Sequence, residues 1–206
     1  MNRMRFKEIF LFSIVLFSLE SHGQVGDVYN IQIQLKGLED SVAYLGYHMG
    51  EKKYVQDTSL ISPNGEVSFS KPERLKKGVY FLYSKGYYLE FLVKEQEFSL
   101  ETTKLDPYGD IKIKGSPENE IFRLFQLTMR DHQNNIRSLN EELKEAKAKD
   151  DSAAIYDRAR KLGELNIKKR DSLKGVYPDS YTAVLLRLME NPKKDFMNDN
   201  SASVEE

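Results

Sequence analysis

The sequence has 206 residues, and its 31 Lys and Arg against 32 Asp and Glu give a formal net charge of -1 at pH 7. It is 40% hydrophobic, enough to bury a core in one medium domain or two small ones. The balanced charge argues against nucleic-acid binding, which needs a basic surface. The sequence contains no Cys, which excludes thiol catalysis, disulfides, zinc–thiolate sites and lipidation through Cys.

The first residues have the pattern of an export signal. Positively charged residues precede an apolar run at residues 9–19, and Ser21 and Gly23 are small residues at the positions that a signal peptidase reads. A helix of that length rises only about 16 Å, too short for a bilayer core of about 30 Å. We therefore expect residues 1–23 to be removed, and we expect no membrane contact after cleavage.

Apolar residues recur with a period of two over residues 28–114, as in Ile31, Ile33 and Leu35, and this period indicates half-buried strands. Turn residues separate the runs. Since no helical pattern lies between them, we expect antiparallel sheets in a sandwich or a partly open barrel. The pattern predicts about eight short strands, at residues 31–35, 42–47, 54–60, 67–69, 79–83, 87–93, 98–100 and 111–113.

The pattern changes at Ser116, where a helix should begin. Ser116, Pro117 and Glu118 supply an N-cap hydroxyl, a proline in the first turn and an early carboxylate. A second helix, with a new cap at residues 149–152, should run to Gly175 and complete an antiparallel hairpin. The first helix has a coiled-coil seam with alternating steps of three and four. The seam positions are Phe122, Phe125, Met129, His132, Ile136, Leu139, Leu143 and Ala146.

Pairing the two helices about their turn brings polar residues together about halfway along the hairpin. His132 should lie near Lys169, and Ile136 near Asn166. One interpretation of this polar layer of His132, Asn166 and Lys169 is a solvated contact that fixes the register of the helices. The other is a small-ligand or partner contact at His132 and Lys169.

A third helix should follow Tyr177 and Pro178, with Asp179 or Ser180 as its cap, and end near residue 191. Apolar residues cover most of its circumference, as in helices buried on several sides, and each large one left in water forgoes about 1.5–3 kcal/mol of burial. We expect it to pack against the β domain or to contact a partner. The candidate partner surface comprises Val184, Leu185, Leu186, Leu188 and Met189.

Few residues are candidates for catalysis or for binding a metal or cofactor. His48 and Glu51 alone make no metal site, since such sites take three or four ligands, and the glycines lie at hairpin turns rather than in a phosphate-binding loop. We expect no catalytic residue, no metal and no cofactor. The tyrosines of the strand region either form a face on which sugars or peptides stack, or are ordinary sheet residues with one edge of the ring exposed to solvent. They are Tyr44, Tyr47, Tyr54, Tyr80, Tyr83, Tyr87 and Tyr88.

Several short patterns occur in a specific order. They lie at residues 33–37 and 42–45, 57–61 and 64–69, 78–82, 91–100 and 113–119, followed by long helices. In this order they resemble the N-terminal domain of unknown function 4369, found before thioredoxin-like domains in exported thiol-disulfide oxidoreductases of Bacteroidetes-type Gram-negative bacteria. The resemblance covers residues 31–192. It implies a periplasmic location and an association with thioredoxin-like domains. Family members usually continue into a thioredoxin fold with a Cys-x-x-Cys pair, which this sequence lacks, so redox activity is not implied for any residue here.

The sequence thus predicts an α+β protein. An antiparallel β domain at residues 24–115 precedes a helical hairpin and third helix at residues 116–192, and a polar, disordered tail at residues 193–206. The leading hypothesis is a non-catalytic exported accessory module that binds protein, either a thioredoxin-like domain or a second copy. The alternative is a small-ligand module that binds a glycan or peptide on the Tyr-rich sheet, and the third hypothesis is a stand-alone enzyme.

Overall fold

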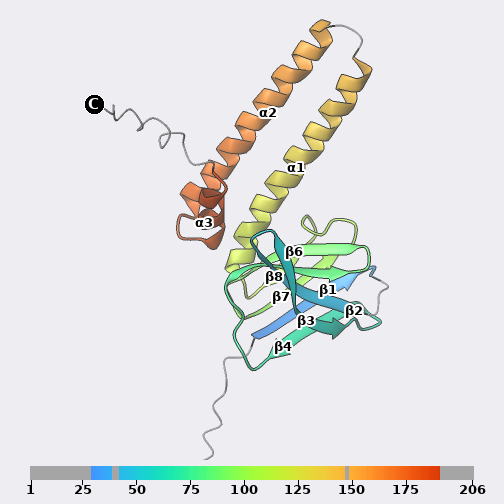
Figure 1. Ribbon diagram of the computed structural model, residues 1–206, viewed down its shortest axis with the longest axis vertical. Coiled ribbons are helices and arrows are strands. Elements are labelled where there is room, and N and C mark those ends of the chain that lie inside the picture. Colours follow the sequence, from blue (N-terminus) through green and yellow to red (C-terminus); the bar gives the residue numbers. More distant parts are fainter. Residues whose placement is uncertain (1–28, 39–41, 147–148, 191–206) are drawn as a thin grey trace, which may run out of the picture.

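The computed structural model describes residues 29–38, 42–146 and 149–190. Figure 1 shows a β domain from which two long helices project side by side. The expected signal at residues 1–23 and the expected tail at residues 193–206 lie outside the described residues.

All the predicted strands are present in the described ranges, with ends that differ by a few residues. They form two sheets of four strands, in the orders β4-β1-β7-β8 and β3-β2-β5-β6. The strands are β1 (Tyr29–Lys36), β2 (Val42–Met49), β3 (Lys52–Leu60), β4 (Glu66–Lys71), β5 (Gly78–Ser84), β6 (Tyr87–Val93), β7 (Glu97–Thr103) and β8 (Lys112–Lys114).

The core lies between the two sheets. Alternate side chains of β1 point into it, and Tyr29, Ile31, Ile33 and Leu35 are each at most 1% exposed. Side chains from both sheets join one apolar cluster, as the period of two predicts for a sandwich. The predicted fold class is therefore confirmed, and the sheets do not close into a barrel.

One strand pairing differs from the antiparallel prediction. β1 pairs with β7 in parallel, from Asn30 beside Glu97 to Lys36 beside Thr103, whereas the other pairings in the two sheets are antiparallel. The period of two shows which face of a strand is buried but carries no information about strand direction. About 60 residues separate the two strands, far more than the dozen or so that a parallel return requires.

A partly buried carboxylate, that of Asp57, links the two sheets. Asp57 of β3 accepts hydrogen bonds from the Tyr29 hydroxyl of β1 at 2.8 Å and from its neighbour's amide, the Thr58 N–H, at 2.8 Å. Lys71 of β4 forms an ion pair with it at 2.8 Å. Burial alone would raise the pKa of Asp57, but the bonds from Lys71, Tyr29 and Thr58 outweigh it and lower this pKa.

The helices are α1 (Pro117–Glu145), α2 (Lys149–Val176) and α3 (Tyr181–Leu188). The predicted caps are confirmed at two ends, since Ser116 accepts from the Asn119 N–H and Ser180 from the Ala183 N–H. α2 begins at Lys149, so the residues predicted as its cap form its first turn instead. Acidic side chains are tolerated there because the helix dipole favours negative charge at the N-terminus. α3 is shorter than predicted and ends at Leu188.

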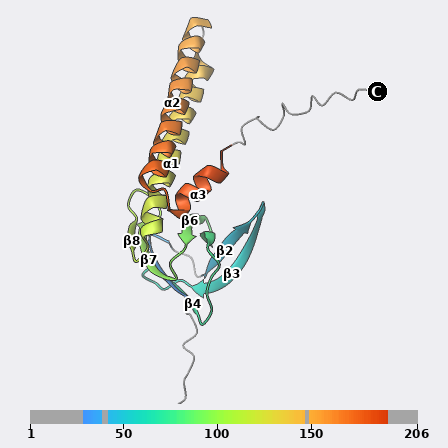
Figure 2. The ribbon, with the colours of Figure 1, turned by 90° about the vertical axis from the view of Figure 1, so that its left-hand side faces the viewer.

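α1 and α2 pack antiparallel along their lengths and extend away from the β domain, and we call this pair the arm (Figure 1, Figure 2). α3 lies at the base of the arm, where it contacts both α1 and α2. None of these helices, in the part of the chain that the structure describes, is long and apolar enough to cross a bilayer.

Candidate functional site

A buried polar joint connects the β domain to the helices. Ser116, Glu118 and Asn119, at the start of α1, are each at most 3% exposed. Buried polar side chains need hydrogen-bond partners, since leaving one without a partner costs about 1–3 kcal/mol. The partners of these three side chains lie in the β domain and in α3, so the joint fixes how the three parts meet.

Asn119 attaches α1 to the edge of a sheet. Its Oδ1 accepts a hydrogen bond from the Leu92 N–H at 2.7 Å, and its Nδ2 donates to the Leu92 carbonyl at 2.8 Å. Leu92 belongs to β6, the edge strand of its sheet, so the side-chain amide takes the place of a neighbouring strand. About two helical turns further on, on the same face of α1, Gln126 donates to the carbonyl of Glu90 at 3.0 Å. This edge is therefore covered and closed to pairing with another chain.

Glu118 connects all three parts of the structure. Its Oε1 accepts from Lys94 Nζ at 2.5 Å, and its Oε2 accepts from the backbone N–H of Tyr181 at 2.9 Å. The hydrogen bond to Glu118 raises the pKa of Lys94, against the effect of burial. Because Lys94 follows β6 and Tyr181 begins α3, this carboxylate sets where α3 starts relative to the β domain.

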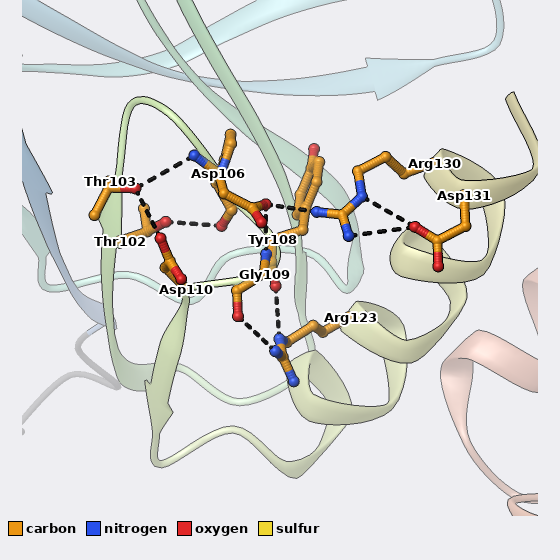
Figure 3. Close-up of polar contacts among 10 residues, drawn as sticks. Thr102, Thr103, Asp106, Tyr108, Gly109, Asp110, Arg123, Arg130 and Asp131 are labelled. Atoms are coloured by element: carbon orange, nitrogen blue, oxygen red, sulfur yellow. Dashed lines mark hydrogen bonds and ion pairs between the residues drawn. The ribbon is translucent and has the colours of Figure 1, made fainter. Parts of the chain in front are cut away.

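A loop of the β domain provides a second attachment (Figure 3). Arg123 of α1 donates to the carbonyls of Tyr108 and Gly109, both at 2.7 Å. Arg130 reaches Asp106 at 2.5 Å, and the same carboxylate accepts from the Gly109 N–H at 2.8 Å. The loop between β7 and β8 is thus held against α1 over about two helical turns beyond the joint.

The structure divides the predicted partner surface on α3. Val184, Leu188 and Met189 are 41%, 76% and 55% exposed, and Leu185 is half-buried. Leu186 is 1% exposed, so it packs inside the chain and cannot contact a partner. The apolar pattern covered most of the helix and therefore did not show which side faces inward.

The three residues of the predicted polar layer lie close together in the arm. His132, Asn166 and Lys169 line one small hollow of about 30 Å³ between α1 and α2. Asn166 is 7% exposed, and its Nδ2 lies 3.9 Å from the Met129 sulfur. A hollow of this size holds about one water molecule. The geometry therefore fits a register-fixing contact better than a ligand site.

The tyrosines do not form one continuous face. Tyr44 and Tyr83 pair at 6.2 Å between ring centroids on one side of their sheet. Tyr47 instead lies close to Tyr54 and Tyr80, at 5.5 and 5.8 Å. Residues 44 and 47 are an odd number apart, so the period of two already places them on opposite faces.

His48 contacts residues other than the one considered from sequence. Its Nε2 lies 3.0 Å from the Tyr88 hydroxyl and 3.3 Å from a carboxylate oxygen of Glu90. Glu51 is an exposed turn residue. Among the described residues, no group of three or more His, Asp and Glu is arranged to hold a metal ion.

The comparison with known families covers the β domain and its joint to α1. Residues 29–122 match the family model of a domain of unknown function, DUF4369. The match includes Ser116, Glu118 and Asn119, so the start of α1 lies within the stretch that is similar to DUF4369, whereas most of the arm lies beyond it. No curated protein and no solved structure matches the chain significantly.

Proposed function

We propose that this chain is a non-catalytic protein-interaction module, in which the β domain holds the helices in a fixed orientation and α3 contacts a protein partner. One observation carries the proposal. α3 is held at its first residue by the buried Glu118, yet its far end leaves Leu188 and Met189 76% and 55% exposed. Large apolar side chains on a helix whose start is held in place suit docking, because little conformational freedom is lost when a partner binds.

The proposal includes export to the periplasm of a Gram-negative bacterium. The basic and then apolar segment at residues 1–23 supports it. The resemblance to the front part of thioredoxin-like oxidoreductases supports a thioredoxin-like domain as the partner. A second copy of this chain is the other protein partner that an exposed apolar helix end fits.

Sedimentation velocity of the purified protein, alone and with a thioredoxin-like domain from an exported DUF4369 protein, tests this proposal. We expect the mean mass to rise between about 1 and 500 µM, or a complex to form. The double substitution Leu188→Lys and Met189→Lys should weaken the association at least about tenfold by placing charge in the contact.

The matched control is Ile167→Lys with Val176→Lys, because these α2 residues are also exposed, at 56% and 63%. It should leave the association unchanged. A chain that stays monomeric at every concentration and binds no thioredoxin-like domain contradicts the proposal, as does an equal effect of the two double substitutions.

A second candidate function, small-ligand binding by the β domain, is favoured by a separate observation. Tyr47 and Tyr80 line a hollow of about 380 Å³, which lies within the range of about 300–1,000 Å³ common for ligand sites. A ligand that binds only the native state raises the melting temperature, so thermal-shift measurements with glycans and peptides test this candidate.

A further inference from the structure

The hollow lies between the end of the β2–β3 hairpin and the segment that precedes β5. Its lining combines aromatic, amide and cationic side chains, and its acidic group, Glu73, is outnumbered by the cations. The residues that carry the argument are Tyr47, Gln56, Lys76, Lys77 and Tyr80.

A β-bulge directs Gln56 into the hollow. Leu45 pairs with Asp57 but the next residue of β2, Gly46, pairs with Val55, so Gln56 has no partner across the ladder. Bulges turn a side chain away from its regular alternation and are common beside binding sites. The side-chain amide of Gln56 carries both a donor and an acceptor, which suit a hydroxylated ligand.

The cationic wall is held in place by a buried contact. Gln96 accepts from the Leu75 N–H at 2.8 Å and donates to the Leu75 carbonyl at 3.3 Å, and Leu75 is 5% exposed. The exposed Lys76 and Lys77 follow directly. Their backbone is therefore fixed before any ligand arrives, which lowers the entropic cost of binding.

Two tyrosines give the hollow an aromatic wall. The ring centroids of Tyr47 and Tyr80 lie 5.8 Å apart. Burial, and then the proximity of Tyr47, raises the pKa of Tyr80 to about 12, so its hydroxyl stays protonated at neutral pH. Aromatic surface beside hydrogen-bonding groups suits the apolar face and hydroxyl edge of a sugar ring.

We infer that this hollow binds an acidic sugar, with the ring against Tyr47 and the carboxylate beside Lys76 and Lys77. The inference rests on the second candidate function, small-ligand binding, and adds the ligand class. The excess of cations over Glu73 favours an anion, and the aromatic wall favours a ring over a compact ion. A free uronic acid and an acidic polysaccharide both present this chemistry.

Isothermal titration calorimetry of the purified protein tests the inference. The probes are galacturonate, tetragalacturonate, a neutral tetrasaccharide of glucose, and citrate as an anion without a ring. We expect saturable binding of a uronate at least about tenfold tighter than that of the neutral tetrasaccharide or of citrate. Tighter binding of the monomer indicates a free sugar acid as the source, tighter binding of the tetramer indicates a polysaccharide, and either supports the inference.

The double substitution Lys76→Ala and Lys77→Ala should weaken uronate binding at least about tenfold. Lys144→Ala with Lys168→Ala, two exposed lysines of the arm, removes the same charge elsewhere and should leave binding unchanged. Equal effects of the two pairs, or equal affinity for the uronate and the neutral sugar or citrate, overturn the acidic-sugar assignment and leave small-ligand binding standing. The absence of saturable binding to these probes, together with no thermal shift from any glycan or peptide, overturns both.

Discussion

The substitution Asn119→Ala tests how the arm is attached to the β domain. In the native structure the Asn119 amide bonds to the N–H and the carbonyl of Leu92, at 2.7 and 2.8 Å. Leu92 is 0% exposed. Truncation of this side chain therefore leaves two buried backbone groups without their partner.

Each buried group left unsatisfied costs about 1–3 kcal/mol, so the two together cost about 2–6 kcal/mol. A water molecule in the vacated space restores part of this, and alanine adds about 0.5 kcal/mol of helix propensity. We expect the free energy of unfolding to fall by about 2–4 kcal/mol. Because domains have a total of about 5–15 kcal/mol, most of the protein should still fold.

Urea denaturation followed by circular dichroism gives this free energy, and hydrogen exchange of the Leu92 amide localises the change. The matched control is Asn134→Ala, an exposed position of the same helix, which should change stability by less than about 0.5 kcal/mol. If Asn119→Ala costs no more than this control and the Leu92 amide stays protected, the assigned role of the amide is wrong.

Two further predictions concern the β domain and the arm. The lowered pKa of Asp57 stabilises the fold above the unfolded-state value of about 3.9, and this contribution disappears as the pH falls through the folded-state pKa. Asp57→Asn should therefore cost about 1–3 kcal/mol at neutral pH and reduce the loss of stability on acidification, as measured by urea unfolding at several pH values. The exposed control Asp151→Asn should retain the native pH dependence. A Cβ at Gly46 would collide with the Phe81 ring, so Gly46→Ala should lower the free energy of unfolding, measured with urea, by about 1–3 kcal/mol. Gly163→Ala, in open space on α2, should raise the free energy of unfolding by about 0.5–1 kcal/mol. An unchanged pH dependence in Asp57→Asn, or a neutral Gly46→Ala, would contradict the packing described for these residues.

Local signals in the sequence were sufficient for the elements. The alternation of Ile31, Ile33 and Leu35 with polar residues identified a strand that the structure buries on one face. The hydroxyl, proline and carboxylate at Ser116 to Glu118 identified the start of α1. Each of these signals depends on residues within one or two turns of each other, which is why no tertiary information was needed.

Contacts between distant residues were not predictable in this way. The sequence indicated a helix-capping role for Glu118, whereas its carboxylate bonds to Lys94 and Tyr181, 24 and 63 residues away. The parallel pairing of β1 with β7 and the bulge at Gln56 likewise depend on how strands align, which the period of two does not specify. The joint and the hollow therefore emerged only from the folded structure.

The claim that the β domain holds the arm rigidly is tested most directly by the distance between two spin labels. The sequence contains no Cys, so paired substitutions can be labelled at Ser70→Cys in β4 and Glu145→Cys at the end of α1 without further changes. A reference pair, Ser70→Cys with Lys112→Cys, lies within one sheet and gives the width due to the labels themselves. Pulsed electron paramagnetic resonance should show one distance distribution across the joint, as narrow as that of the reference pair. A broad or multiple distribution for the pair that spans the joint would contradict a fixed arm.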